Sequence, residues 1–351
     1  MHFAKESVFF SALRTFCTAF GALIGAACAI LVVVLGLSLF SGPSILPPEQ
    51  LEISIAADAD GNRKLLPMTT PVILRIDLHG VIGEGKLTSE SIEKVLYGSR
   101  EDFLGNNRVK AILLHIDTPG GIASDADGID RLLMNYKKKY NIPIYAFVDG
   151  ICASGGMYIA AAADKIYATG DSIIGAIGVI MGPAFNFSEV MKKVGVESLT
   201  LTEGKDKDML NPFRPWKPGE DASLRTIMDQ LYARFVDVII TSRPQIGREK
   251  LINEYGAHVF SAVDAQKIGY IDVADSEYSD ALTALCHTAG ISADAPYQVV
   301  SLKTETSFVS SLIENRFNPI PGKITHVFQI GPNLNTEMSG KFLYLYTSLC
   351  P

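Results

Sequence analysis

Short apolar runs alternate with longer segments of helical periodicity from Val72 to Ala168, and this alternation limits the possible folds more than any other feature of the chain. The runs predict strands at Val72–Leu78, Val109–Ile116, Ile142–Val148 and Lys165–Ala168, with helices between them at Thr88–Phe103, Ser124–Lys139 and Ser154–Ala163. Strands joined through a helix run parallel, with right-handed crossovers. We therefore expect an α/β domain of βαβ units with helices against a largely parallel sheet.

The pattern continues toward the C-terminus. It predicts a helix at Phe187–Val194, a strand at Ser198–Thr202, a long helix at Gly219–Ser242 and shorter helices at Ala262–Ile268 and Tyr278–Thr288. With 351 residues, 48% of them hydrophobic, the chain can bury a full core.

The N-terminal region has the composition of a membrane span. No charged residue occurs from Thr15 to Pro48, and Phe20–Phe40 is long enough to cross a hydrocarbon layer of roughly 30 Å. Lys5 and Arg14 precede it and the next basic residue is Arg63, which predicts a cytoplasmic N-terminus and a body outside. A cleaved signal peptide is the alternative, but this length favours a retained single-pass anchor.

Charge and cysteine content argue against several classes of function. A formal net charge of −7 disfavours nucleic acid as the main partner. The five cysteines are scattered, which is typical of neither a disulfide framework nor a metal site. No other metal-ligand spacing occurs, so we expect no metal and no cofactor.

Ser154 is the candidate nucleophile. It follows the strand at Ile142–Val148 and opens a small-residue segment, Ser154-Gly155-Gly156. A core strand, a turn and a serine at the start of a helix is a common way to present a nucleophile, and the two glycines leave space for a substrate backbone. The alternatives are that Ser154 is a helix N-cap, or that the thiol of Cys152 reacts instead of lying buried as a core residue.

A serine nucleophile also needs oxyanion donors and a base. The glycine turn Asp117–Gly121 follows an apolar strand, where it can direct N–H groups at a ligand or serve as an ordinary turn. Within Gly204–Asp208, a lysine would act as the base only when neutral, and lowering a lysine pKa from about 10.4 to about 7 costs roughly 4–5 kcal/mol. Burial must supply that shift, and otherwise the segment is a solvated loop. His115 offers a rival triad with Ser154 and an acid.

Four motifs resemble, in order and spacing, the signal peptide peptidase A family of membrane-anchored serine peptidases. They are Asp117-Thr118-Pro119-Gly120-Gly121, Ala153–Gly156 with Tyr158-Ile159-Ala160, Gly175-Ala176-Ile177-Gly178-Val179, and Gly204-x-x-Lys207 before Pro212. The likeness covers roughly Val72 to Asp272. It implies a fold like that of the Clp protease and crotonase superfamily, with repeated β-β-α or βαβ units, and a Ser–Lys dyad.

The resemblance also implies roles for individual residues. Ser154 would be the nucleophile, and Lys207, not its neighbour Lys205, would be the general base. Backbone N–H groups of Gly155 and of the turn glycines, Gly120 or Gly121, would bind the oxyanion.

One departure from the family concerns Ala176, where family members often have a serine that helps to orient the lysine. A hydroxyl of Ser172 or Thr169 would substitute, or the lysine would be held less firmly. The departure motivates one alternative, a catalytically inactive membrane scaffold on the same fold. Acyl-CoA chemistry on a crotonase-like fold is a weaker alternative, because an exported body would not meet coenzyme A.

The expected protein is thus a membrane-anchored serine endopeptidase that degrades remnant signal peptides and other extended, apolar peptides. By resemblance it is a homo-oligomer of the bacterial plasma membrane, with its catalytic domain extracytoplasmic. Its expected divisions are a cytoplasmic tip and anchor at 1–41, a linker at 42–70, the catalytic domain at 71–290 and a C-terminal extension of unassigned role at 291–351.

Overall fold

The computed structural model describes residues 8–40, 51–304 and 341–346. The chain divides into two units, Met1–Gln50 with Glu305–Lys323, and Leu51–Thr304 with Ile324–Pro351. In the first unit the described element is the helix α1 (Val8–Phe40). Within the described residues, no helix combines the length and the hydropathy that crossing a bilayer requires, so the predicted transmembrane helix is not confirmed. Residues 1–7 of the predicted tip and 305–340 and 347–351 of the predicted extension lie outside the description.

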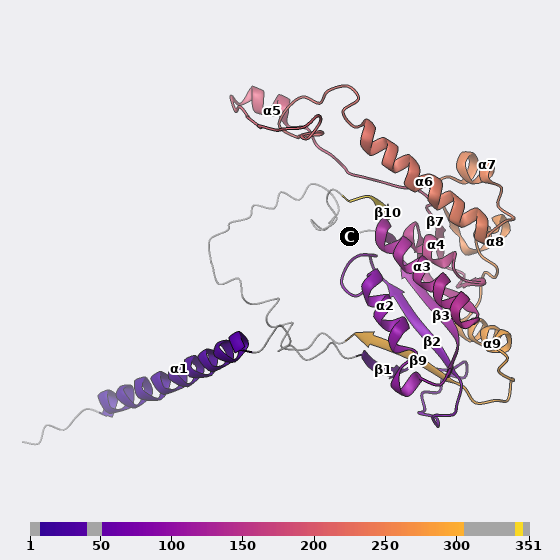
Figure 1. The fold of residues 1–351 in the computed structure, drawn as a ribbon, viewed down its shortest axis with the longest axis horizontal. Helices are drawn as coiled ribbons and strands as arrows, with labels where there is room; N and C mark the ends of the chain where they lie inside the picture. Colours follow the sequence, from indigo (N-terminus) through magenta and orange to yellow (C-terminus); the bar gives the residue numbers. More distant parts are fainter. Residues whose placement is uncertain (1–7, 41–50, 305–340, 347–351) are drawn as a thin grey trace, which may run out of the picture. The chain divides into compact units, whose positions relative to one another are not determined.

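The second unit is built on a sheet of eight described strands (Figure 1). The order is β1 (Leu51–Ile55), β9 (Gln298–Thr304), β2 (Val72–His79), β3 (Val109–Thr118), β5 (Ile144–Ala153), β7 (Ile173–Gly175) and β8 (Val259–Ser261), and β6 (Lys165–Ala168) pairs with β5. The central pairs are parallel, and the outer pairs β1–β9 and β7–β8 are antiparallel. The predicted α/β class is confirmed.

Local chemistry marks one end of each of the two longer crossover helices. Between β2 and β3 lies α2 (Ser89–Gly98), whose N-cap Thr88 accepts a hydrogen bond from the Ser91 N–H. Between β3 and β5 lies α3 (Ala123–Tyr140), which ends at Asn141 in the left-handed conformation. The short helix α4 (Gly155–Ala160) follows β5. The sheet and these helices form the expected βαβ units.

Side chains alternate between the two faces of the sheet and so create two hydrophobic layers. Val72, Leu74 and Ile76 of β2 face the layer formed with α2, α3, α4 and α6 (Ala222–Ser242). Ile73 faces the other layer, which α9 (Tyr278–Thr288) covers. Each fully buried isoleucine or leucine contributes about 1.5–3 kcal/mol, so the double layer holds the strand ends rigidly.

The later elements agree with the sequence prediction less uniformly. The helices α8 (Ala262–Ile268) and α9 occupy the predicted residues, and α5 (Ser188–Lys193) lies within its predicted range. The predicted strand at Ser198–Thr202 is wrong: these residues form no strand, and Leu199 and Leu201 are 84% and 86% exposed. Alternating apolar residues become a strand only where a partner edge is available. The helix predicted to reach Phe103 ends at Gly98, and a 3₁₀ turn follows at Asp102–Leu104.

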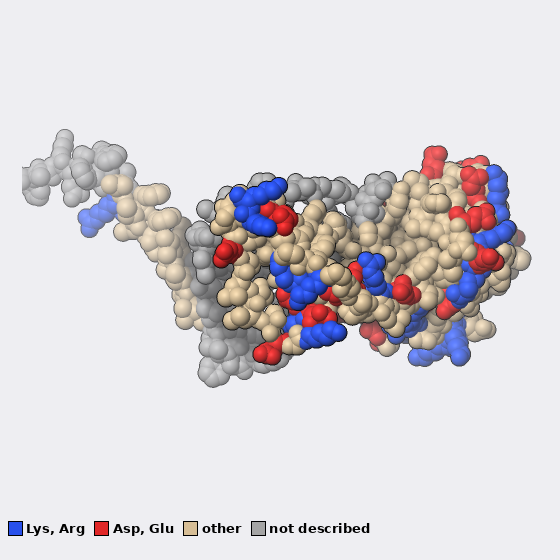
Figure 2. Space-filling model, turned by 90° about the horizontal axis from the view of Figure 1, so that it is seen from above, with Lys and Arg blue, Asp and Glu red and all other residues tan. Residues whose placement is uncertain are grey.

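The surface carries charges of both signs. On the face seen in Figure 2, Lys and Arg side chains are interspersed with Asp and Glu side chains. Mixed charge of this kind favours solubility over a strong field of one sign.

Candidate active site

Ser154 lies at the turn between β5 and α4 in an unusual backbone conformation. Ser154 has a φ of 53° and a ψ of −114°, and only 2% of the residue is exposed to solvent. A non-glycine residue with positive φ is strained, and such strain is typical of functional sites. Ser154 occupies the N-cap position of α4, as one reading of the sequence held, but its side chain makes no capping hydrogen bond to the helix.

The glycines after Ser154 allow the turn to pack against neighbouring strands. A Cβ on Gly156 would lie 2.8 Å from Cγ2 of Thr118 at the end of β3. A Cβ on Gly155 would lie 3.0 Å from Cδ1 of Ile82. A larger residue at Gly156 would press on the end of β3, and one at Gly155 would press on Ile82.

The glycine turn after β3 lies directly against Ser154's neighbour. Gly120 has a φ of 98°, and a Cβ on it would lie 2.7 Å from the Gly155 nitrogen. Gly120 donates its N–H to Oγ1 of Thr118 at 3.1 Å. The turn continues as a short strand, β4 (Gly120–Ile122).

A strand from the end of the chain covers this turn. The strand β10 (Leu343–Leu345) pairs antiparallel with β4, with Tyr344 opposite Gly121. Ala123 N–H donates to Phe342 O at 3.1 Å and Tyr346 N–H donates to Pro119 O at 2.8 Å. On its other edge, β10 exchanges two bonds of 2.9 Å between Leu343 and Ile180.

The bonds at Ala123–Phe342 and Tyr346–Pro119 lie two residues to either side of the Tyr344–Gly121 pair. Because hydrogen-bonded pairs alternate along an antiparallel ladder, Tyr344 and Gly121 are also a hydrogen-bonded pair. The Tyr344 carbonyl oxygen also lies at the Ser154 turn, because a Cβ on Gly155 would be 3.1 Å from it and a Cβ on Gly120 would collide with it. The sequence prediction missed this strand. Its apolar residues stand in the unassigned extension, and local sequence does not show which edge they pair with.

The Tyr344 side chain occupies an aromatic pocket. Its ring stacks on Tyr158 of α4 at 5.2 Å and packs against Phe235 of α6 at 4.6 Å. Its hydroxyl donates to Leu231 O at 3.0 Å. These contacts bury the ring completely and leave a cavity of about 580 Å³ beside it, lined by residues of α3, α6 and the segment 341–344.

His115 does not form the rival triad. Its ring nitrogens lie near Arg75, His79, Asp77 and Asp149, and none of its contacts in the described part of the chain involves Ser154. The Cys152 thiol is fully buried with its Sγ 3.6 Å from Met157, and burial strongly raises its pKa, so it is not a reactive thiol.

One cluster has metal-ligating atoms close together. The ligand atoms of Asp77, His79 and His115 lie within 4.8 Å of one another. The Arg75 guanidinium already fills this cluster, since Nε lies 2.6 Å from Asp77 Oδ1 and Nη2 lies 2.9 Å from His115 Nδ1. We therefore assign no metal to it.

Lys207 lies in the exposed segment between α5 and α6, and Lys205 is exposed beside it. No hydrogen bond or ion pair joins Lys207 to Ser154, both of which the structure describes. In Figure 1, α5 lies away from α4, beyond the far end of α6. A single chain therefore brings the two glycine motifs to Ser154 but not the lysine.

The hydroxyls considered as substitutes at Ala176 are engaged elsewhere. Thr169 Oγ1 lies 2.8 Å from Ser172 Oγ, which donates to Val148 O at 3.1 Å. Ala176 itself is buried with a φ of 55°.

Comparison with known proteins identifies relatives. Residues 136–292 match the family model described as peptidase family S49. A protein named "Putative protease MJ0651" from Methanocaldococcus jannaschii is 32% identical over 192 residues, which is 55% of this chain and 60% of that protein, less than two thirds of its length. The "Putative signal peptide peptidase SppA" of Enterococcus faecium is 30% identical over 292 residues, 79% of this chain and 81% of that protein. Among solved structures, a ClpP1 mutant from Listeria monocytogenes is similar with a TM-score of 0.39 and 17% identity, over 61% of this chain and 96% of that one.

Proposed function

Because the chain belongs to peptidase family S49, we propose that it is a serine endopeptidase that cleaves extended, apolar peptides with a Ser154–Lys207 dyad. The observation that carries this proposal is β10, which lies antiparallel on β4 beside Ser154. An extended peptide that adds to a sheet edge gains main-chain hydrogen bonds, and side-chain pockets give selectivity. In the proposal, a substrate takes the place that β10 occupies.

The oxyanion donors in this proposal are the N–H groups of Gly121 and Gly155. Gly120 is the poorer candidate, since its N–H is engaged by Thr118. In this proposal, the Tyr344 carbonyl next to Gly155 occupies the position that the carbonyl of a bound substrate would take. Removing one such donor typically costs about 10²–10³ in kcat.

The proposed reaction proceeds by acyl transfer. A neutral Lys207 amine takes the proton of the Ser154 hydroxyl as Oγ attacks the substrate carbonyl carbon. The C–N bond then breaks, and the leaving amine takes the proton from the lysine. Water hydrolyses the resulting serine ester and restores the hydroxyl.

Lys207 reaches Ser154 in this proposal only in an assembly. We define the arm as residues 184–217, which contain Lys207. The arm exposes large apolar side chains, namely Phe185, Phe187, Val190, Val194, Val196, Leu199, Leu201, Phe213 and Trp216. Exposed apolar surface on this scale is typical of a protein contact. We propose a homo-oligomer in which the arm of one subunit covers the Ser154 site of its neighbour and excludes water around the lysine.

We further propose that the substrates include remnant signal peptides and that the protein acts at the outer face of a bacterial plasma membrane. Both proposals are based on the family resemblance, and the location is based also on the apolar segment Phe20–Phe40. Extraction of membranes with alkaline carbonate tests attachment. Retention of the protein in the membrane pellet would support an integral anchor. Complete release into the supernatant would contradict the proposed anchor.

The test of the activity uses a fluorophosphonate probe on the assembled protein. Wild type should take the probe and cleave apolar peptides, whereas Ser154→Ala should do neither. Equal labelling of both proteins would remove Ser154 from the mechanism. The second candidate function, an inactive scaffold, is favoured by Ala176 and would be supported by a folded oligomer that neither labels nor cleaves.

A further inference from the structure

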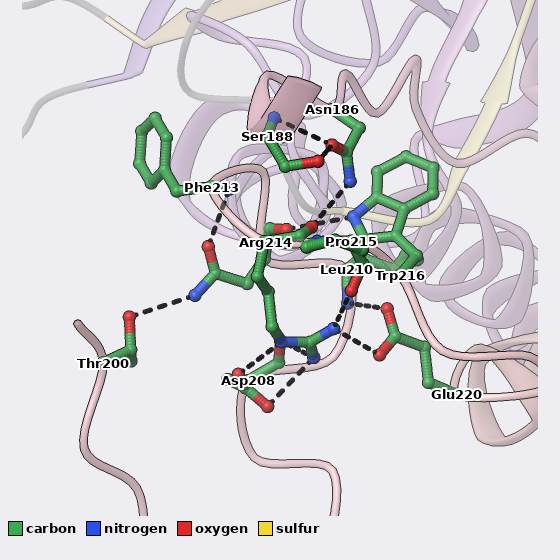
Figure 3. Close-up of polar contacts among 11 residues, drawn as sticks. Asn186, Ser188, Thr200, Asp208, Leu210, Phe213, Arg214, Pro215, Trp216 and Glu220 are labelled. Carbon is green, nitrogen blue, oxygen red and sulfur yellow. Dashed lines mark hydrogen bonds and ion pairs between the residues drawn. The ribbon is translucent and has the colours of Figure 1, made fainter. Parts of the chain in front are cut away.

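The Arg214 guanidinium binds the residue next to Lys207, Asp208, and also contacts Glu220 (Figure 3). Arg214 Nε lies 2.7 Å from Asp208 Oδ2, and Nη2 donates to Oδ1 of the same carboxylate at 3.0 Å. Nη2 also donates to the Asp208 carbonyl at 2.8 Å, so Arg214 fixes both the side chain and the backbone of the residue next to Lys207.

Glu220 completes this contact from the segment before α6. Its carboxylate lies 2.8 Å from Arg214 Nη1 and accepts the Leu210 N–H at 3.0 Å. The Glu220 side chain is only 3% exposed, although the arm around it is largely solvated. We call Asp208, Arg214 and Glu220 the arginine clamp.

The clamp holds a loop that would not keep its shape by local preference. Asp206 and Leu210, on either side of Lys207, have φ values of 56° and 53°. A branched residue such as Leu210 rarely adopts this region, and it persists only where surrounding contacts enforce it. The Glu220 bond to the Leu210 amide is such a contact.

We propose that Arg214 is a positioning residue for proton transfer: through Asp208 and Glu220 it fixes the loop so that Lys207 is presented in one orientation to Ser154. The inference rests on the proposed Ser–Lys function. It also answers the question raised by Ala176, because this chain holds its lysine loop by a guanidinium instead of a neighbouring hydroxyl.

The chemistry of the clamp suits this role. A planar guanidinium binds two carboxylates and a carbonyl in fixed directions, which an ammonium does not. Hydrogen bonding to Asp208 raises the pKa of Arg214, and hydrogen bonding to Arg214 lowers the pKa of Asp208. Arg214 and Asp208 therefore stay ionised across the working pH range, so a defect in the Arg214 variants does not come from titration of this pair.

The test compares Arg214→Ala and Arg214→Lys with wild type in the assembled, full-length protein. Arg225→Ala is the matched control, because Arg225 pairs with Asp221 at 2.6 Å on the surface of α6 without touching the lysine loop. The measurements are kcat and KM for an apolar peptide between pH 6 and 10, and the oligomeric state by light scattering.

We expect Arg214→Ala to lower kcat about 100-fold with little change in KM, since misplaced catalytic groups cost about this much. The loss of kcat should appear at every pH measured, because changing the pH does not restore the geometry that the missing guanidinium held. Arg214→Lys keeps the positive charge but loses the planar guanidinium that binds both carboxylates, so this variant should show most of the defect in kcat. Arg225→Ala should match wild type.

Several outcomes would overturn the inference. A wild-type profile in Arg214→Ala, full activity in Arg214→Lys, or loss of activity that follows dissociation alone would each show that Arg214 does not position the base. Glu220→Gln keeps the shape of the clamp and must show a weaker defect of the same kind if Arg214→Ala fails to fold. Lys207→Ala distinguishes failure of the dyad from failure of the positioning role. An active Lys207→Ala variant would refute the Ser154–Lys207 dyad itself. An inactive Lys207→Ala variant together with a fully active Arg214→Ala variant would refute only the positioning role of Arg214.

Discussion

The carbonyl oxygen of Tyr344 lies against Gly155, the residue after Ser154, so that a Cβ there would be 3.1 Å from it. The chain thus covers its own serine with an extended apolar strand. In the proposed binding mode, a peptide substrate reaches Ser154 only after it displaces β10 from β4.

Tyr344→Ala should open the site. It removes the ring from its pocket between Tyr158 and Phe235, which weakens the hold on β10 by about 3 kcal/mol. We expect fluorophosphonate labelling of Ser154 to become at least about tenfold faster. Tyr97→Ala, on the exposed surface of α2, is the control. Labelling no faster than in wild type would mean that β10 does not restrict access.

Gly156→Ala should destabilise the fold. The new Cβ would lie 2.8 Å from Cγ2 of Thr118, and overpacking of this kind costs about 1–3 kcal/mol. Gly247→Ala is the control, since a Cβ there meets nothing within 4 Å. Thermal unfolding should show a lower Tm for Gly156→Ala alone. Equal Tm values would indicate that α4 shifts without cost.

Asp130→Asn should change how stability depends on pH. Burial, with a smaller contribution from Asp127, raises the pKa of Asp130 to about 7. The folded protein holds a proton there that the unfolded chain releases near pH 4, so this group favours folding below about pH 4 and loses that contribution as pH rises to 7.

The asparagine variant is neutral at every pH. Its Tm should exceed that of wild type at pH 8, by at most the equivalent of about 4 kcal/mol, and the difference should shrink toward pH 4. Asp229→Asn, at an exposed position of α6, should show no such trend. A constant difference between Asp130→Asn and wild type would contradict the assignment.

His115→Gln should retain activity. His115 contacts Arg75 and His79 rather than Ser154, so its loss removes a hydrogen bond worth about 1 kcal/mol and no base. We expect kcat/KM to stay within about threefold of wild type. A fall of about 10⁴, the size expected for a triad member, would restore the histidine as the base.

The parts of the fold that sequence predicts are those set by neighbouring residues. Lys165–Ala168 and Ala262–Ile268 have the predicted bounds because periodicity and caps determine them locally. The close approach of Gly120 to Gly155 follows from parallel strands, whose carboxyl ends meet at one edge.

The parts that sequence does not predict depend on distant partners. Leu199 and Leu201 follow the alternating pattern of a strand, but no described strand pairs with their segment, and both side chains are exposed. Tyr344 has an edge, but its partner Gly121 is more than two hundred residues away. The arginine clamp joins Asp208, from a segment that the sequence also allowed to be a solvated loop, to Arg214 and Glu220 farther along the chain.

Mixing Ser154→Ala with Lys207→Ala tests most directly whether one subunit's lysine serves its neighbour's serine. Each variant alone should be inactive. If the site forms between subunits, random co-assembly restores a wild-type pair at about one quarter of the sites in a closed ring, so the mixture should recover about that share of activity. A mixture of confirmed hetero-oligomers that stays inactive would contradict a dyad built from Ser154 and a partner subunit's lysine.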